Sequence, residues 1–90
     1  MRIDATDIGM NNAAEVAAAG IQAIRGGDYA FDLSAVRTCD SSAVAVVLAW
    51  QREAQASGRR LALAGLPPAL VSLATVYGVA PLLDLDPPTA

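Results

Sequence analysis

Hydrophobic and polar positions along this chain follow two different periods, which predicts short strands separated by helices. Residues 29–33 alternate at a period of two, with aromatic and leucine side chains on one side, as expected of a half-buried strand. The short apolar run 61–64 predicts a second strand, and residues 2–6 predict an earlier one.

Three helices are predicted between and after these strands. The first begins at Asn12, where a cap residue is followed three positions later by a glutamate, and it stops at the Gly26-Gly27 pair. The second runs from about residue 42 to 57, and the third, with proline in its first turn, ends near residue 77. Alternating strands and helices favour an α/β fold with right-handed crossovers and a small parallel or mixed sheet.

Length and composition change this picture little. The 90 residues suffice for a single domain spanning 1–90, in which 54% hydrophobic but only 4% aromatic residues imply an aliphatic core. The tail at 86–90 is expected to fray. No continuous apolar run reaches the roughly 18 residues that span a bilayer, and no signal pattern opens the chain, so a cytoplasmic protein is expected.

Charge and residue types exclude several functions. Six arginines, no lysine and a net charge of -3 provide no basic patch, so nucleic acid is not an expected partner. The chain has no histidine, so Cys39 has neither a catalytic base nor companions for a zinc site. The serines likewise lack a base, and there is no phosphate-binding glycine loop. A binding module without catalytic activity, metal or cofactor is therefore expected.

The junction before the second helix carries the most distinctive polar residues. Asp40 and Ser41 lie where unpaired N–H groups and the positive end of the helix dipole gather. Either side chain can serve as a cap, worth about 1 kcal/mol. The same position can present a hydroxyl to a partner or hold a phosphate on Ser41. The residues alone leave both uses open.

The second helix has more apolar residues than one face requires. The face predicted to pack on the sheet comprises Val44, Val47, Leu48, Gln51 and Ala54. Val46, Ala49 and Trp50 point elsewhere, where a small domain has no second layer to cover them. We interpret them as a protein-contact patch, and the alternative is that Trp50 lies at the rim of the core.

Two segments resemble the STAS domain. They are FDLSAVRTCDSSAVAVVLAW, residues 31–50, and GRRLALAGLPPALVSLATVYGV, residues 58–79. The shared pattern is a strand ending in Asp-Leu-Ser, an Asp-Ser pair opening a helix, a glycine-ended helix, an apolar strand and a final helix closing near Gly-Val. The resemblance covers about residues 29–83 and implies a STAS-like sheet with helices packed on it. The usual N-terminal hairpin is shortened or missing, which leaves one sheet edge bare or covered by a partner.

The resemblance implies two alternative functions for Ser41. In anti-sigma factor antagonists this position is phosphorylated by a partner kinase, whereas MlaB-like proteins place there a hydroxyl that contacts a transporter ATPase. Asp40 matches the adjacent family acid. Ala43 departs from the glycine of the antagonist motif, and the segments VVLAW and LATVYGV are similar to MlaB-like proteins.

The MlaB-like alternative is therefore favoured. It implies an accessory subunit that binds the ATPase, and through it the permease, of a phospholipid-transport ABC complex that maintains lipid asymmetry. Such a subunit would lie on the cytoplasmic face of the inner membrane without inserting into it. The expected partner-binding residues are Asp40, Ser41, Ser42, Val46, Trp50 and Tyr77. The alternatives are an anti-sigma factor antagonist switched by phosphorylation of Ser41 and a scaffold without a switch.

Overall fold

The computed structural model describes residues 1–78, and its helices and strands follow the predicted order. The elements are β1 (Asp7–Ile8), α1 (Ala13–Arg25), β2 (Ala30–Asp32), β3 (Thr38–Cys39), α2 (Ser41–Ala56), β4 (Ala62–Ala64) and α3 (Pro68–Val76). The predicted fraying of the tail at 86–90 concerns residues outside this range. None of the described helices is long and apolar enough to cross a lipid bilayer.

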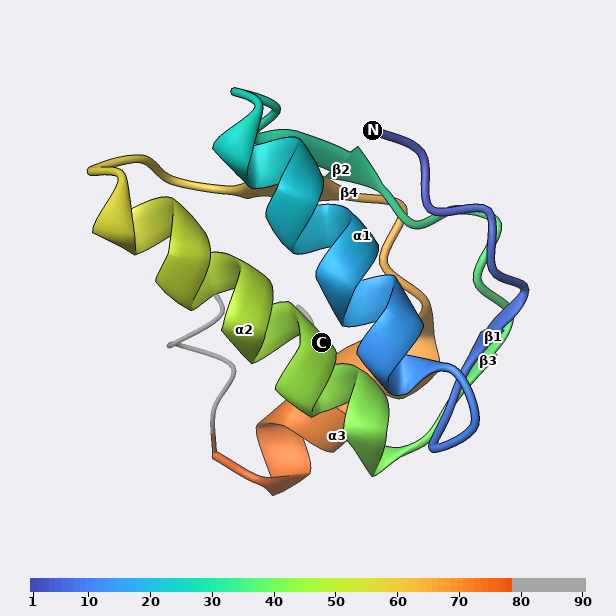
Figure 1. Cartoon of the computed structure of the whole chain (residues 1–90). Helices are drawn as coiled ribbons and strands as arrows, with labels where there is room; N and C mark the ends of the chain where they lie inside the picture. The colour runs from blue at the N-terminus through green and yellow to red at the C-terminus, as the bar shows by residue number, and fades with distance from the viewer. Residues whose placement is uncertain (79–90) are drawn as a thin grey trace.

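The strands within residues 1–78 pair in parallel. β1 pairs with β3, and β2 pairs with β4, so that Phe31 lies opposite Leu63. A bridge between Arg2 and Asp32 places the start of the chain along β2 as well. Figure 1 shows the resulting order, in which the N-terminal segment and β4 lie on opposite sides of the β2–β3 segment. The strands form two separate two-stranded sheets, where a single small sheet was predicted. The arrangement agrees with the predicted STAS-like fold, and the described residues contain no N-terminal hairpin.

The sequence placed the first strand wrongly and missed one strand. Of the predicted strand at 2–6 only Arg2 forms a bridge, and the regular pairing comes later, in β1. β3 has two residues and directly precedes α2, so it shows no alternation that a sequence pattern can reveal.

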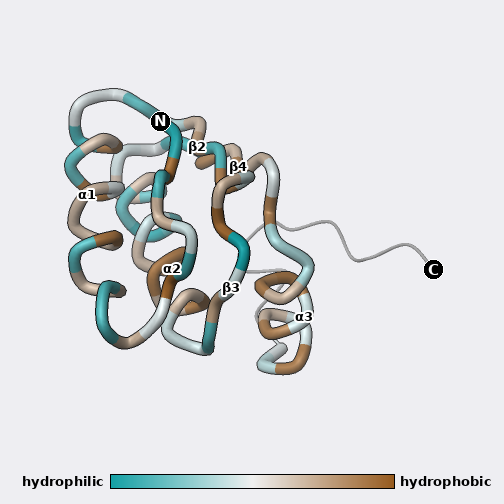
Figure 2. The backbone as a smooth tube through the Cα atoms, turned by 90° about the vertical axis from the view of Figure 1, so that its right-hand side faces the viewer, coloured by the Kyte–Doolittle hydropathy of each residue, from teal (hydrophilic) through white to brown (hydrophobic). Residues whose placement is uncertain are grey.

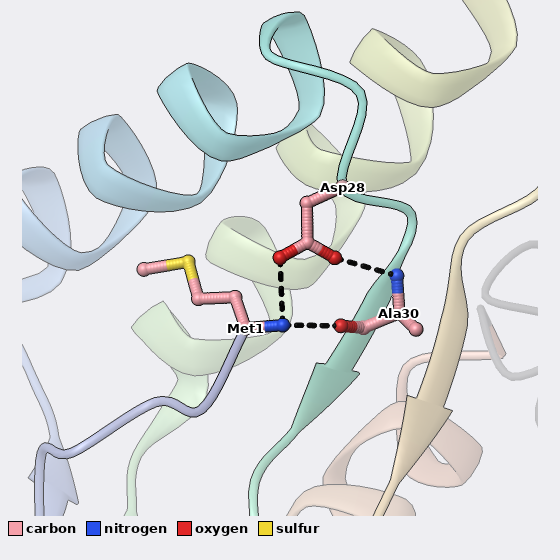
Figure 3. Close-up of polar contacts among 3 residues, drawn as sticks. All are labelled: Met1, Asp28 and Ala30. Carbon is pink, nitrogen blue, oxygen red and sulfur yellow. Dashed lines mark hydrogen bonds and ion pairs between the residues drawn. The ribbon is translucent and has the colours of Figure 1, made fainter.

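The N-terminal segment is held against β2 by charge as well as by backbone pairing (Figure 3). The Met1 ammonium lies 2.7 Å from Asp28 Oδ2 and donates to the Ala30 carbonyl at 2.6 Å. Asp28 Oδ1 in turn accepts the Ala30 N–H at 3.1 Å. Both contacts lower the pKa of Asp28, and the ammonium has the larger effect of the two. The contact places the start of the chain beside β2.

Local signals set the helix ends largely as predicted. Asn12 occupies the N-cap position of α1, but its side chain makes no capping bond, so the predicted capping box with Glu15 does not form. Gly58 follows α2 with φ +70°, the left-handed conformation expected of a glycine terminator. The third predicted helix is α3, with Pro68 at its first position.

The helix α1 packs along α2, which the sequence analysis did not anticipate. Figure 1 shows α1 and α2 side by side across the strands, with α3 beside α2 near β3. Figure 2 shows hydrophobic positions alternating with hydrophilic ones along α1, whereas α3 is hydrophobic to near neutral along its length. Of the residues on the predicted sheet-packing face of α2, Val44, Val47, Gln51 and Ala54 are buried and Leu48 is half-buried. The side of α2 next to α1 is buried too.

The prediction that Val46 and Trp50 form a partner surface is wrong. Val46 is 3% exposed and Trp50 is 0% exposed. The indole N–H of Trp50 donates to the Ala17 carbonyl of α1 at 3.1 Å, and its ring meets Phe31 edge-on with centroids 5.0 Å apart. Packing of α1 along α2 therefore removes from solvent the patch that appeared unpartnered.

Candidate functional site

The start of α2 is capped by the side chain of Asp40. Asp40 has extended backbone angles, and its Oδ1 accepts the Ser42 N–H at 2.8 Å. The Ser42 hydroxyl donates to the same oxygen. This pairing satisfies one of the free N–H groups of the first turn and occupies the Ser42 hydroxyl donor. Asp40, and not Ser41, is thus the cap.

Ser41 is the hydroxyl that remains available. Its side chain is exposed and makes no hydrogen bond to another residue of the described chain. It sits on the first position of α2, where the helix dipole and the backbone N–H groups favour an acceptor or a negative group from outside. The geometry therefore separates two uses that the sequence left open, because Asp40 caps the helix while Ser41 faces solvent.

A short loop before α1 lies against the Asp40 carboxylate. A Cβ atom on Gly9 would lie 3.1 Å from Asp40 Oδ2, so the glycine permits this close approach. The Ser42 hydroxyl and the Ser42 N–H, with a smaller contribution from the Met10 N–H, hold the pKa of Asp40 below its usual value despite partial desolvation. Asp40 is therefore ionised at neutral pH and joins the loop to the helix.

Two hollows border the start of α2, one at Asp40 and the other at Ser42. The first, of about 390 Å³, is lined by β1, β3 and the loop before α1, and includes Asp7, Met10 and Asp40 among its lining residues. The other, of about 230 Å³, lies between α1 and α2 and is lined mainly by alanines together with Ser42. The start of α2 thus borders one polar hollow and one apolar hollow. A partner that contacts the free hydroxyl of Ser41 can therefore also make polar and apolar contacts nearby.

Cys39 is not arranged for nucleophilic chemistry. It is half-buried at the end of β3, and burial, followed by the neighbouring Asp40 charge, raises the pKa of its thiol. The thiol therefore stays protonated at neutral pH, the form that is a poor nucleophile.

The expected site residues fall into three groups. Asp40, Ser41 and Ser42 lie together at the start of α2, as their adjacency in sequence requires. Tyr77 is 56% exposed at the end of α3, and no hydrogen bond joins it to that cluster within residues 1–78. Val46 and Trp50 belong to the core.

Sequence reasoning missed the loop from Gly9 to Asn12. Asn12 Oδ1 accepts the Gly9 N–H at 2.9 Å, and its amide donates to the Asp7 carbonyl at 2.7 Å. The Gly-Met-Asn-Asn stretch carries turn-forming residues, which is a signal for a loop. A turn signal does not predict which distant residue a loop contacts. Only the tertiary structure shows that this loop lies beside Asp40.

The lowered pKa of Asp40 predicts a pH-dependent contribution to stability. Its folded pKa lies below the unfolded value, so the contribution is present above about pH 4 and is lost as pH falls through the folded pKa. We expect the difference in unfolding free energy between wild type and Asp40→Asn to shrink between about pH 6 and pH 2.5. Urea unfolding followed by circular dichroism measures it. A difference that stays constant over this range would show that the charge is not involved.

Comparison with protein families agrees with this fold. The family model described as "Mlab, STAS domain" matches residues 5–84, which is most of the chain. None of the curated proteins compared with the chain matches it. The match extends from the N-terminal segment through the Asp40-Ser41-Ser42 cluster to beyond α3. The chain therefore belongs to the MlaB-type STAS domain family.

Proposed function

We propose that this protein is a non-catalytic accessory subunit that binds the ATPase of a phospholipid-transport ABC complex through the start of α2. The observation that carries the proposal is the exposed, unbonded hydroxyl of Ser41 on a helix end already capped by Asp40. The MlaB-type family match supports the proposal. Through the ATPase the subunit would reach the permease at the cytoplasmic face of the membrane, without inserting into the bilayer itself.

The geometry suits docking in three ways. The Asp40–Ser42 pairing satisfies the Ser42 N–H and the Ser42 hydroxyl internally, so these two donors need no partner when water is excluded. Ser41 is small, which allows the surface of the partner to approach the first turn closely. Its hydroxyl both donates and accepts, so one or two hydrogen bonds with backbone or side-chain groups of the ATPase can form there.

Substitutions at Ser41 test the proposal. We expect Ser41→Thr to keep binding to the ATPase, because the hydroxyl remains. Ser41→Glu is expected to fold, since a carboxylate suits a helix N-terminus, but to bind at least about tenfold more weakly. Its bulk and charge would be buried beside Asp40 in a contact made for a small neutral group. Co-purification of the ATPase, with circular dichroism of each variant, gives the measurement.

A matched control separates this local effect from a general effect of charge. Ser72 is an exposed serine on α3, so Ser72→Glu adds the same charge and bulk elsewhere. It should leave recovery of the ATPase unchanged. Equal recovery with wild type, Ser41→Thr and Ser41→Glu would remove Ser41 from the interface.

The second candidate function is an anti-sigma factor antagonist controlled by phosphorylation of Ser41. The same exposed hydroxyl favours it, because a kinase can reach it and the helix N-terminus can stabilise the phosphate formed. Mass spectrometry of the protein isolated from its own cells distinguishes the two functions. Phosphate on Ser41 supports the antagonist, and recovery of the transporter ATPase with unmodified protein supports the accessory subunit.

A further inference from the structure

Met10 is the most exposed of the large hydrophobic residues in the described chain. Its side chain is 87% exposed, although the residue lies between two elements that are both packed on the core, β1 and α1. A single exposed hydrophobic side chain is ordinary on a protein surface. Met10 differs from an ordinary exposed side chain because its loop is held by hydrogen bonds and borders a hollow lined by two carboxylates.

The loop that carries Met10 is held by hydrogen bonds on both sides. Asn12 bonds to Gly9 and to Asp7 through its side chain, and the Gly9 carbonyl accepts the N–H groups of Asn12 and Ala13 at 3.1 and 2.8 Å. On the other side the loop backbone approaches the Asp40 carboxylate. The loop is thus fastened to the residue that precedes Ser41, and ordering it on binding costs less conformational entropy than ordering a free loop.

The hollow beside Met10 has a definite charge. Asp7 and Asp40 both line it, and no arginine does. A partner that covers Met10 therefore also approaches two carboxylates, and its own side chains at that point must be positive or able to donate hydrogen bonds to avoid leaving these charges unpaired.

We propose that Met10 is a second anchor of the docking surface at Ser41, and that it enters an apolar pocket of the same ATPase whose rim carries arginine or lysine facing Asp7 and Asp40. The inference rests on the proposed function and extends the contact from the start of α2 to the loop before α1. Methionine suits this role because its unbranched thioether adapts to an irregular apolar pocket. Asn12 is a positioning residue, which acts by holding Met10 in place.

The test uses the purified ATPase of the lipid-transport complex from the same organism and a direct measurement of its Kd. Met10→Leu, which keeps an apolar side chain, should bind within about threefold of wild type. Met10→Gln has nearly the same length but is polar, and it should weaken binding by about tenfold or more. Because position 10 is exposed, the thermal midpoint of both variants should stay at the wild-type value.

Asn12 and a second amide residue provide a matched pair. Asn12→Ala removes both bonds that hold the loop and should weaken binding, whereas Gln22→Ala truncates an exposed amide side chain of α1 that does not line the hollow and should not. Raising the ionic strength should weaken wild-type binding, because the proposed charge contacts lie at the rim.

The outcomes separate this inference from the proposed function. If Met10→Gln and Asn12→Ala bind as tightly as wild type while Ser41→Glu does not bind, the second anchor is overturned and the docking site at Ser41 stands. If the wild-type protein does not bind the ATPase at all, both are overturned. Selective loss with Met10→Gln and Asn12→Ala, retained binding with Met10→Leu and Gln22→Ala, and weakening by salt together support the second anchor.

Discussion

Replacing Trp50 with alanine is expected to lower the free energy of unfolding by about 3–5 kcal/mol. The side chain is fully buried, its ring packs edge-on against Phe31, and its N–H bonds to the Ala17 carbonyl of α1. Truncation removes the apolar contacts and leaves a cavity at the junction of α1, α2 and the sheet. The same change leaves the Ala17 carbonyl without its indole partner, which adds to the loss.

Urea unfolding followed by circular dichroism measures this prediction. Tyr77→Ala provides the control, because it truncates an aromatic side chain that is 56% exposed at the end of α3. Its expected cost is below about 1 kcal/mol. A Trp50→Ala variant that unfolds at the wild-type urea concentration would show that this residue is not in the core and would revive the partner surface predicted from the sequence.

Gly20→Ala is expected to destabilise the protein although alanine is the better helix former. In an exposed helix the change would stabilise by up to about 1 kcal/mol. Here an added Cβ would lie 2.8 Å from Cδ1 of Trp50, with Nε1 and Cε2 nearer still. The indole is buried on all sides and cannot move without disturbing the core, so overpacking should give a net loss of about 1–3 kcal/mol.

A second glycine and a double variant make this prediction specific. Gly26 follows α1 with φ -82°, and the nearest atom to an added Cβ there is 3.4 Å away, so Gly26→Ala should be neutral or stabilising. In a Trp50→Leu background, which frees space beside α1, Gly20→Ala should lose most of its cost. An increase in stability for Gly20→Ala in the wild-type background would contradict the close packing of α1 on Trp50.

These two residues show why sequence reasoning placed the partner surface wrongly. A helical wheel of α2 correctly separates the face with Val44 and Val47 from the face with Val46 and Trp50. It does not show what covers the second face. Gly20 of α1 is the position that admits the indole. The two signals lie 30 residues apart, and only packing of α1 against α2 connects them.

The sequence by itself determined the features of this protein that depend on neighbouring residues. Strand–helix alternation set the α/β class, local residues set most helix ends and the left-handed terminator at Gly58, and adjacency placed Asp40, Ser41 and Ser42 together. These features follow from backbone propensities and hydrogen bonds that span a few residues. The tertiary structure alone decided which hydroxyl stays free, that Trp50 is buried, and that Met10 lies beside Asp40. The burial of Trp50 and the place of Met10 depend on contacts between elements distant in the chain, and the free hydroxyl depends on side-chain geometry, which no local pattern encodes.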